Sequence, residues 1–215
     1  METTLNNNNT PLKGEILRKM IHYSSALISF IYFFIEKNIA VTILLTILII
    51  LLTVEFIKYK NDSFYNFYMK YFKHMLREHE YDKRTFRING ATWVILSCLL
   101  CILIFPKLIA IMGMLLLSFA DSTSGIIGRL YGKKQYAPNR SYIGTTAFFI
   151  SGILVIALTP KYTYSSTEYM VCTAAVIITT FAEAFNLHID DNFTIPVVGS
   201  LSLYMLYIIF LNIPF

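Results

Sequence analysis

The sequence predicts an all-α protein, a polytopic membrane helix bundle of about seven transmembrane helices with a cytosolic N-terminus. Of the 215 residues, 56% are hydrophobic and only 14% are charged. A soluble domain carries about 25% charged residues, because its surface faces water. Seven apolar runs also approach the ~17–25 residues that a spanning helix needs. They cover residues 21–35, 39–57, 90–105, 107–124, 143–159, 169–186 and 193–212.

The basic residues predict the orientation of these runs. All but three of the 18 Lys and Arg lie in the N-terminal segment and in the loops after the second and fourth runs. The exceptions are Lys37, Lys107 and Lys161. Because cytosolic segments of membrane proteins are enriched in Lys and Arg, we expect the N-terminus in the cytosol and the C-terminus on the opposite side. The protein is therefore expected to be an integral multi-pass membrane protein.

The chain is predicted to consist of a disordered tail at residues 1–15 and a single transmembrane catalytic domain at residues 16–215. The tail is polar and rich in Asn, and it has no apolar stretch of the signal-peptide type. Residues 58–89 are expected to be an amphipathic cytosolic segment on an anionic leaflet, because aromatic residues recur among basic ones at helical spacing. A solvated helical hairpin is the alternative.

The net charge of +5 does not indicate a nucleic-acid partner, because the orientation of the helices accounts for the distribution of the basic residues. Cys98, Cys101 and Cys172 all lie inside apolar runs, so no disulfide framework is expected. The four His residues show no ligand spacing typical of zinc sites.

The densest polar cluster follows the fourth apolar run. About fourteen apolar residues, or ~21 Å of helix, precede Asp121, which places it near the inner edge of the membrane. An ionisable group at that depth indicates a functional role. Glycines and basic residues follow it, which suggests a carboxylate for a metal beside a cationic, backbone-exposed cradle for phosphates. Helix packing and topology anchoring are the alternatives. The residues that follow Asp121 are Gly125, Gly128, Arg129, Gly132, Lys133 and Lys134.

The fifth run opens with a second polar segment. Arg140 and Ser141 precede Gly144 and Thr145, and free N–H groups at a helix N-terminus attract anions. A simple N-cap at Ser141 is the alternative interpretation.

The loop after the sixth run contains no Lys or Arg and carries Asp190, Asp191 and Asn192. Carboxylate and amide oxygens are hard ligands of the kind that Mg²⁺ prefers, although a capping turn would use the same residues. Pro196 is expected in the first turn of the seventh helix. Glu183 precedes this loop and is either a catalytic carboxylate or an interfacial one. All these polar groups are expected on the cytosolic side.

In chain order, these motifs resemble the CTP-dependent polyprenol kinase family, which includes dolichol kinases, phytol kinases and CTP-dependent diacylglycerol kinases. Two departures from the family pattern matter: it has Lys where this chain has Arg140 and Glu where it has Ile143. A third is mild, with Ser124 in place of Ala. The loss of that Glu leaves altered substrate choice or loss of activity open. The matching segments are Arg18-Lys19-x-x-His22, Gly90-Ala91-Thr92-Trp93, Asp121, Gly128-Arg129-x-x-Gly132-Lys133, Ser141, Gly144-Thr145 and Asp190-Asp191-Asn192-x-x-x-Pro196.

The resemblance implies a kinase that transfers the γ-phosphate of CTP to the hydroxyl of a membrane lipid alcohol, such as a polyprenol, phytol or diacylglycerol. It implies Mg²⁺ as cofactor and an active site on the cytosolic face. Catalysis would use Asp121, Lys133, Arg140 and Glu183, and the metal would use Asp121, Asp190, Asp191 and Asn192. The nucleotide would contact Gly125, Gly128, Arg129, Gly132, Lys134, Ser141, Gly144 and Thr145.

Two other functions remain open at this point. Phosphatidate cytidylyltransferases, which make a CDP-lipid, carry a similar central segment, but their later His-Gly-Gly and Asp-Arg-x-Asp signatures do not occur in these 215 residues. A transporter or non-catalytic membrane protein could also use buried carboxylates and glycine-rich helices. The sequence does not identify the lipid, the host membrane, or whether the chain forms a homodimer.

Overall fold

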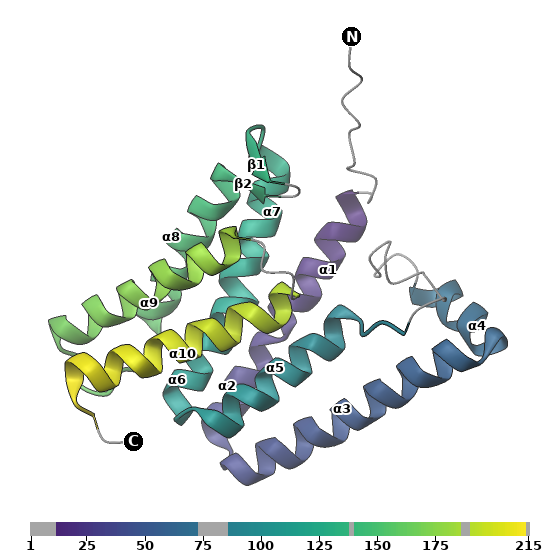
Figure 1. Ribbon diagram of the computed structural model, residues 1–215, viewed down its shortest axis with the longest axis horizontal. Coiled ribbons are helices and arrows are strands. Elements are labelled where there is room, and N and C mark those ends of the chain that lie inside the picture. Colours follow the sequence, from purple (N-terminus) through teal and green to yellow (C-terminus); the bar gives the residue numbers. More distant parts are fainter. Residues whose placement is uncertain (1–11, 73–85, 138–139, 186–189, 214–215) are drawn as a thin grey trace.

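The computed structural model describes residues 12–72, 86–137, 140–185 and 190–213, and these residues are almost entirely helical (Figure 1). One short antiparallel pair, β1 (Gln135–Ala137) and β2 (Arg140–Ser141), interrupts the helices. The helical segments in chain order are α1 (Leu12–Ser24), α2 (Ala26–Phe34), α3 (Lys37–Lys60), α4 (Asp62–Phe72), α5 (Gly90–Ile104), α6 (Lys107–Leu115), the π-helical η3 (Leu116–Asp121), α7 (Ser122–Tyr131), α8 (Tyr142–Leu158), α9 (Ser166–Ala184) and α10 (Asp191–Leu211).

Six of the seven predicted apolar runs each fall on one continuous helix, and the prediction of an all-α membrane helix bundle is confirmed. Three described helices are long and apolar enough to cross a membrane: α3, the continuous Lys107–Tyr131 and α10. Helices α5 and α8 are apolar but shorter. The first run is divided between α1 and α2 at Ser25, whose hydroxyl donates to the His22 carbonyl and lies 2.8 Å from Ser118 Oγ.

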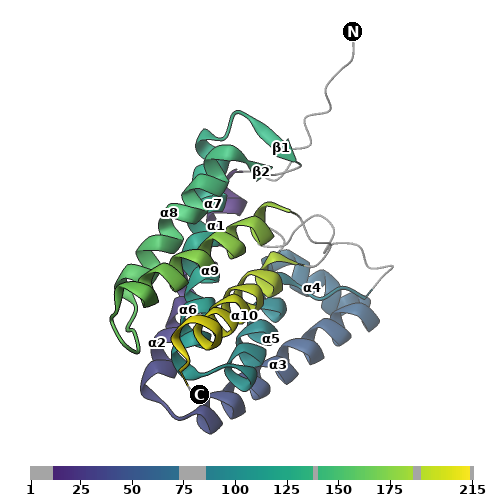
Figure 2. The ribbon, with the colours of Figure 1, turned by 60° about the vertical axis from the view of Figure 1, so that its left-hand side comes forward.

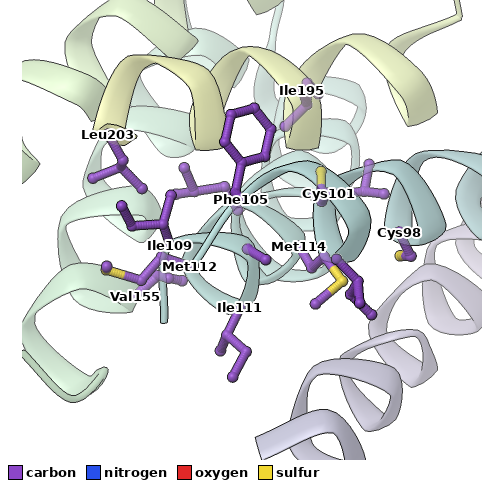
Figure 3. Packing of buried hydrophobic residues seen from close by; sticks show 14 of the residues in the cluster. Cys98, Cys101, Phe105, Ile109, Ile111, Met112, Met114, Val155, Ile195 and Leu203 are labelled. Atoms are coloured by element: carbon purple, nitrogen blue, oxygen red, sulfur yellow. The ribbon is translucent and has the colours of Figure 1, made fainter. Parts of the chain in front are cut away.

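The continuous helix formed by α6, η3 and α7 lies at the centre of the bundle (Figures 1 and 2). Ile109, Met112 and Leu117 on it are fully buried and pack with residues of α5, α8 and α10, as Figure 3 shows for part of the cluster. Small residues bring the helices close. A Cβ atom built on Gly113 would lie 2.0 Å from Ser200 Oγ, so α6 and α10 could not pack as they do with a larger residue there.

Pro196 lies at the sixth position of α10, and the prediction that it occupies the first turn is wrong. Helix α10 begins at Asp191, and Asp190 is its N-cap. Because proline has no N–H, the carbonyl of Asn192 loses its usual helical donor. Ser97 of α5 donates its hydroxyl to that carbonyl at 2.8 Å. The proline is therefore tolerated inside the helix because a neighbouring helix replaces the missing hydrogen bond.

The three lysines that depart from the charge pattern all bond to backbone carbonyls near helix ends. Lys37 Nζ lies 2.8 Å from Leu103 O, and Lys107 Nζ lies 2.8 Å from Ile35 O. Lys161 Nζ lies 2.6 Å from Thr159 O. The last carbonyls of a helix have no helical donor, and cations are favourable there. These lysines therefore cap helices, which explains their presence outside the basic segments.

Two predicted segments are only partly described. Helix α1 already begins at Leu12, so the last residues of the predicted tail are helical, while residues 1–11 lie outside the description. Of the predicted amphipathic segment, the structure describes the end of α3, helix α4 and residues 86–89. Residues 73–85 lie outside it.

Candidate active site

Asp121 forms a buried ion pair with Lys19 of α1. Asp121 is the last residue of the π-helical segment and is only 6% exposed. Lys19 Nζ lies 2.7 Å from Asp121 Oδ2 and also donates to the Asp121 carbonyl at 3.2 Å. Near this pair, Tyr23 and Thr123 join α1 to α7 by a hydrogen bond of 2.7 Å. Single π-helical turns inside α-helices are frequent at functional sites.

Gly125 gives Lys19 the space to reach Asp121. A Cβ atom at Gly125 would lie 2.2 Å from Lys19 Cε, so the lysine side chain passes directly over this glycine. Any other residue at position 125 would force the lysine stem to move. The glycine that was predicted to contact a nucleotide therefore accommodates a lysine from another helix in this structure.

Arg140 joins two carboxylates from different helices. Its Nη1 donates to Oε1 of Glu183 on α9, and its Nη2 lies 2.7 and 2.9 Å from the two carboxylate oxygens of Asp191 on α10. Burial alone would lower the pKa of the Arg140 guanidinium, but the adjacent charges of Asp191 and Glu183 outweigh burial and raise it. A guanidinium held this way is fully charged, and its planar geometry suits paired oxygen acceptors.

The two ion-paired groups belong to one electrostatic cluster. The charge of Asp121 acts on Arg140, Glu183 and Asp191, and the charge of Lys19 also reaches Asp191. The cluster thus combines three carboxylates with two cations from α1, η3, β2, α9 and α10. The imidazole of His22 acts on Asp121 as well.

The turn between α7 and α8 packs through glycines and Ser141. Ser141 is the N-cap of α8, and its Oγ accepts from the Gly144 N–H at 3.1 Å. A Cβ at Gly128 would lie 3.1 Å from the Gly144 Cα, and a Cβ at Gly132 would lie 2.1 Å from the Gly128 carbonyl oxygen. Three predicted nucleotide-contact glycines therefore serve close packing between α7 and the start of α8.

The remaining predicted residues occupy three different settings. Thr145 Oγ1 lies 3.5 Å from Glu183 Oε2 and 2.7 Å from the hydroxyl of Tyr136 on β1. Lys133 and Lys134 are exposed on the turn after α7, and Arg129 is half-buried on α7.

Asp190 and Asn192 mainly stabilise the start of α10. Asp190 Oδ1 accepts from the Asn192 N–H at 3.0 Å, which is the capping arrangement given above as the alternative. The buried Asn192 amide donates to the Gly90 carbonyl of α5 at 3.3 Å. Two of the four predicted metal ligands, Asp121 and Asp191, thus belong to the ion-paired cluster.

Lys19 and Tyr136 are the residues at the site that were not among the predicted candidates. Lys19 is part of the Arg-Lys-x-x-His segment, and that segment is the only sequence signal for its role. Tyr136 has no comparable signal, because its contact with Thr145 depends on the pairing of β1 with β2.

Comparison with known proteins reveals distant relatives. The chain is 28% identical over 167 residues to CTP-dependent diacylglycerol kinase 1 of Schizosaccharomyces pombe, covering 72% of this chain and 75% of the relative. It is 27% identical to CTP-dependent diacylglycerol kinase 1 of Saccharomyces cerevisiae, covering 88% and 72%. It is 28% identical over 134 residues to probable phytol kinase 1, chloroplastic, of Oryza sativa, covering 56% and 43%.

Scans against protein-family models and against solved structures find no match. The family assignment therefore depends on these relatives and on the ordered motifs. Both lead to the same conclusion: the chain is similar to members of the CTP-dependent polyprenol and lipid kinase family.

Proposed function

We propose that this protein is a lipid-alcohol kinase that transfers the γ-phosphate of CTP to the hydroxyl of a membrane lipid alcohol. The observation that carries the proposal is the buried cluster in which Arg140 bridges Glu183 and Asp191 beside the Lys19–Asp121 pair. Phosphoryl transfer depends on positioning and on charge stabilisation, and the cluster supplies fixed charges of both signs. The names of the relatives supply the choice of CTP as donor.

The cationic side chains would act on the phosphates. Arg140 has a planar fork of donors that fits paired phosphate oxygens, and the exposed Lys133 and Lys134 are free to approach a nucleotide arriving from the cytosol. Arg140 would exchange a carboxylate for a phosphate oxygen as the nucleotide binds. Such an exchange keeps the guanidinium paired throughout, so it avoids the cost of an isolated buried charge.

A carboxylate of the cluster would orient the lipid hydroxyl and accept its proton. Asp121 and Glu183 are the candidates, because both are buried within the cluster and neither is used as a helix cap by its side chain. A general base must lie within hydrogen-bond reach of the proton that it abstracts. Asp121 and Glu183 would therefore hold the hydroxyl oxygen in line with the γ-phosphate.

The cluster has the donor chemistry for Mg²⁺. Among the described residues, no three His, Cys, Asp or Glu side chains are grouped closely enough to form a metal cage. Protein-bound Mg²⁺ is commonly held by one or two carboxylates together with substrate phosphates, and Asp121 and Asp191 fit that requirement. A bound Mg²⁺ would neutralise charge on the triphosphate. Lys19 and Arg140 now balance these carboxylates, and they would turn toward the nucleotide.

The test is transfer of label from CTP to lipid by the full chain in nanodiscs. CTP labelled at the γ-phosphate should give a labelled lipid and unlabelled CDP, whereas CTP labelled at the α-phosphate should leave the lipid unlabelled. The reverse pattern, with release of pyrophosphate, would identify a cytidylyltransferase. A panel of diacylglycerol, phytol, polyprenol and phosphatidate against four nucleotides would define both substrates, and phosphatidate is the acceptor that a cytidylyltransferase requires.

The Asp121→Asn variant links the activity to the site. It should abolish label transfer, because the variant lacks the charge that the proposal assigns to position 121. Glu36→Gln makes the same chemical change at an exposed residue that precedes α3, and it should retain full activity. Undiminished transfer by the Asp121→Asn variant would remove Asp121 from the mechanism. No transfer from any nucleotide to any of these lipids by the unaltered protein would favour a non-catalytic membrane protein or a transporter.

A further inference from the structure

Helix α4 carries two exposed aromatic side chains at one edge. Phe67 is 58% exposed and Tyr71 is 59% exposed, and their ring centroids are 5.1 Å apart. No residue of α4 is buried. Tyrosine is enriched at the membrane interface because its ring is apolar and its hydroxyl is polar, and phenylalanine is common on the apolar face of helices that lie in the interface.

The sequence of α4 gives it three distinct faces. Phe64 and Tyr68 are one turn apart and half-buried, and the ammonium group of Lys58 on α3 lies 5.1 Å from the Tyr68 ring. The exposed polar residues Asp62, Asn66 and Lys70 recur every four residues and form a second stripe. The edge formed by Phe67 and Tyr71 lies between the packed face and the polar stripe.

A buried ion pair of α3 contacts the packed face of α4. Glu55 of α3 is 1% exposed, and its Oε2 lies 2.5 Å from Lys58 Nζ. The same lysine contacts the ring of Tyr68. Lys58 therefore links the buried carboxylate of α3 to the packed face of α4.

The position of α4 in the chain places it at the membrane boundary. Helix α3 has 24 residues, which corresponds to about 36 Å and exceeds the ~30 Å hydrocarbon core. Its last residue, Lys60, therefore lies at the interface. The extended residue Asn61 ends α3, and α4 begins at the next residue. Figure 1 shows α4 beside the end of α3, at the edge of the bundle.

The charge around this edge is complementary to anionic lipids. Lys60 and Lys70 are exposed, and Lys60 Nζ lies 5.4 Å from the Tyr59 ring centroid. Over residues 58–89 the sequence has eight Lys and Arg against four Asp and Glu. Clusters of basic residues directly after a spanning helix are attracted to the anionic lipids of the cytoplasmic leaflet.

We propose that α4 lies in the headgroup region of an anionic membrane, with Phe67 and Tyr71 immersed and with Lys60 and Lys70 at the level of the lipid phosphates. The expected immersion of the two rings is about 5–10 Å into the boundary between headgroups and acyl chains. Asp62 and Asn66 of the polar stripe then face the aqueous side, and Lys70 at the end of the stripe reaches the lipid phosphates.

The test places a nitroxide label at position 67, 71 or 66, one at a time, in the full chain in nanodiscs. The three native cysteines are buried and are first replaced by alanine. Accessibility to oxygen reports the lipid phase, and accessibility to a water-soluble nickel chelate reports water. Phe67→Cys and Tyr71→Cys labels should favour oxygen, whereas the Asn66→Cys label, the matched control on the polar stripe, should favour the chelate.

The lipid composition tests the electrostatic part of the proposal. Labels at 67 and 71 should report deeper immersion in discs with phosphatidylserine than in discs of phosphatidylcholine alone. The double variant Lys60→Gln/Lys70→Gln should remove that difference. High salt should also reduce it, because the Debye length falls to about 3 Å at 1 M.

Three results would overturn the proposal. Labels at 67 and 71 that match the label at 66 would show that the edge faces water. Dipolar broadening between labelled copies would show that a second copy covers it. Immersion that is equal in neutral and anionic discs would exclude the role of charge. The readout is independent of phosphate transfer, so its failure leaves the proposed kinase activity untouched, and a failed kinase assay leaves this proposal untouched.

Discussion

Lys19 crosses Gly125 and places its ammonium group 2.7 Å from the carboxylate of Asp121. The two residues are 102 positions apart in the chain, and both side chains are almost fully buried. The pair therefore connects the first helix to the centre of the bundle. Because neither charge has access to bulk water, each depends on the other for compensation.

Removing one member of this pair should cost more stability than removing both. Lys19→Met or Asp121→Asn alone leaves an uncompensated buried charge, which costs about 3–5 kcal/mol. The double variant leaves no such charge, so its loss should be smaller than the sum of the two single losses. Thermal unfolding of the three purified variants measures this coupling. Strictly additive losses would show that the ion pair contributes nothing as a pair.

The same variants separate stability from chemistry. If Asp121 acts on the substrate, the double variant should remain inactive in phosphate transfer although its stability is partly restored. Recovery of activity in the double variant would show that Asp121 matters only as the partner of Lys19.

Arg140→Lys should reduce phosphate transfer although it preserves the charge. The guanidinium of Arg140 reaches Glu183 with one nitrogen and both oxygens of Asp191 with the other. A lysine ammonium is a point charge and cannot reproduce this fork. Loss of one charged hydrogen bond is worth about 1.5–3 kcal/mol, or roughly a ten- to hundredfold lower rate if the contact persists in the transition state. Initial rates with labelled CTP measure the effect.

Arg87→Lys is the matched control, because it makes the same change at an exposed arginine before α5. It should leave the rate within about twofold of the unaltered protein, as expected for a surface substitution. Equal rates for Arg140→Lys and Arg87→Lys would show that the bidentate geometry at Arg140 is not required.

The sequence predicted the helices well because each apolar run carries its own signal. The runs coincide with helices, and the predicted candidates Asp121, Arg140, Glu183 and Asp191 meet in one cluster. The prediction did not identify the partners within that cluster. Arg140 and Glu183 are 43 positions apart, and their contact depends on how α8 and α9 pack, which no local pattern specifies.

Local geometry was the other part that the sequence left undetermined. The π-helical turn before Asp121 has no signal in the apolar sequence Leu116–Ala120, because its formation depends on packing within the bundle. Pro196 was expected in the first turn because proline favours that position, yet the helix begins earlier, at Asp191, with Asp190 as its N-cap. The hydroxyl of Ser97, on another helix, makes the interior position acceptable.

Ser97 and Pro196 should therefore show coupled effects on stability. Ser97→Ala removes the donor to the Asn192 carbonyl, and a buried carbonyl left without a partner costs about 1–3 kcal/mol. In a Pro196→Ala background the new backbone N–H can bond to that carbonyl, so Ser97→Ala should cost less there. A double-mutant cycle by thermal unfolding measures the difference. The same cost for Ser97→Ala in both backgrounds would contradict this account of Pro196.

Glu168→Gln should destabilise the protein without changing its chemistry. Glu168, at the start of α9, accepts hydrogen bonds from the backbone N–H groups of Tyr162, Thr163 and Tyr164 and from the Tyr207 hydroxyl, all within 2.7–2.8 Å. A glutamine has one acceptor oxygen in place of two and would direct an amide N–H toward existing donors. We expect a loss of about 2–3 kcal/mol in the free energy of unfolding, because charged hydrogen bonds are worth about 1.5–3 kcal/mol each.

Glu183 lies at the other end of α9, about 22 Å along the helix axis. Phosphate transfer per folded molecule, measured well below the melting temperature, should therefore stay unchanged. Glu36→Gln, at an exposed carboxylate, should change neither quantity. Loss of activity in Glu168→Gln at full folding would show that the α8–α9 connection communicates with the cluster around Asp121.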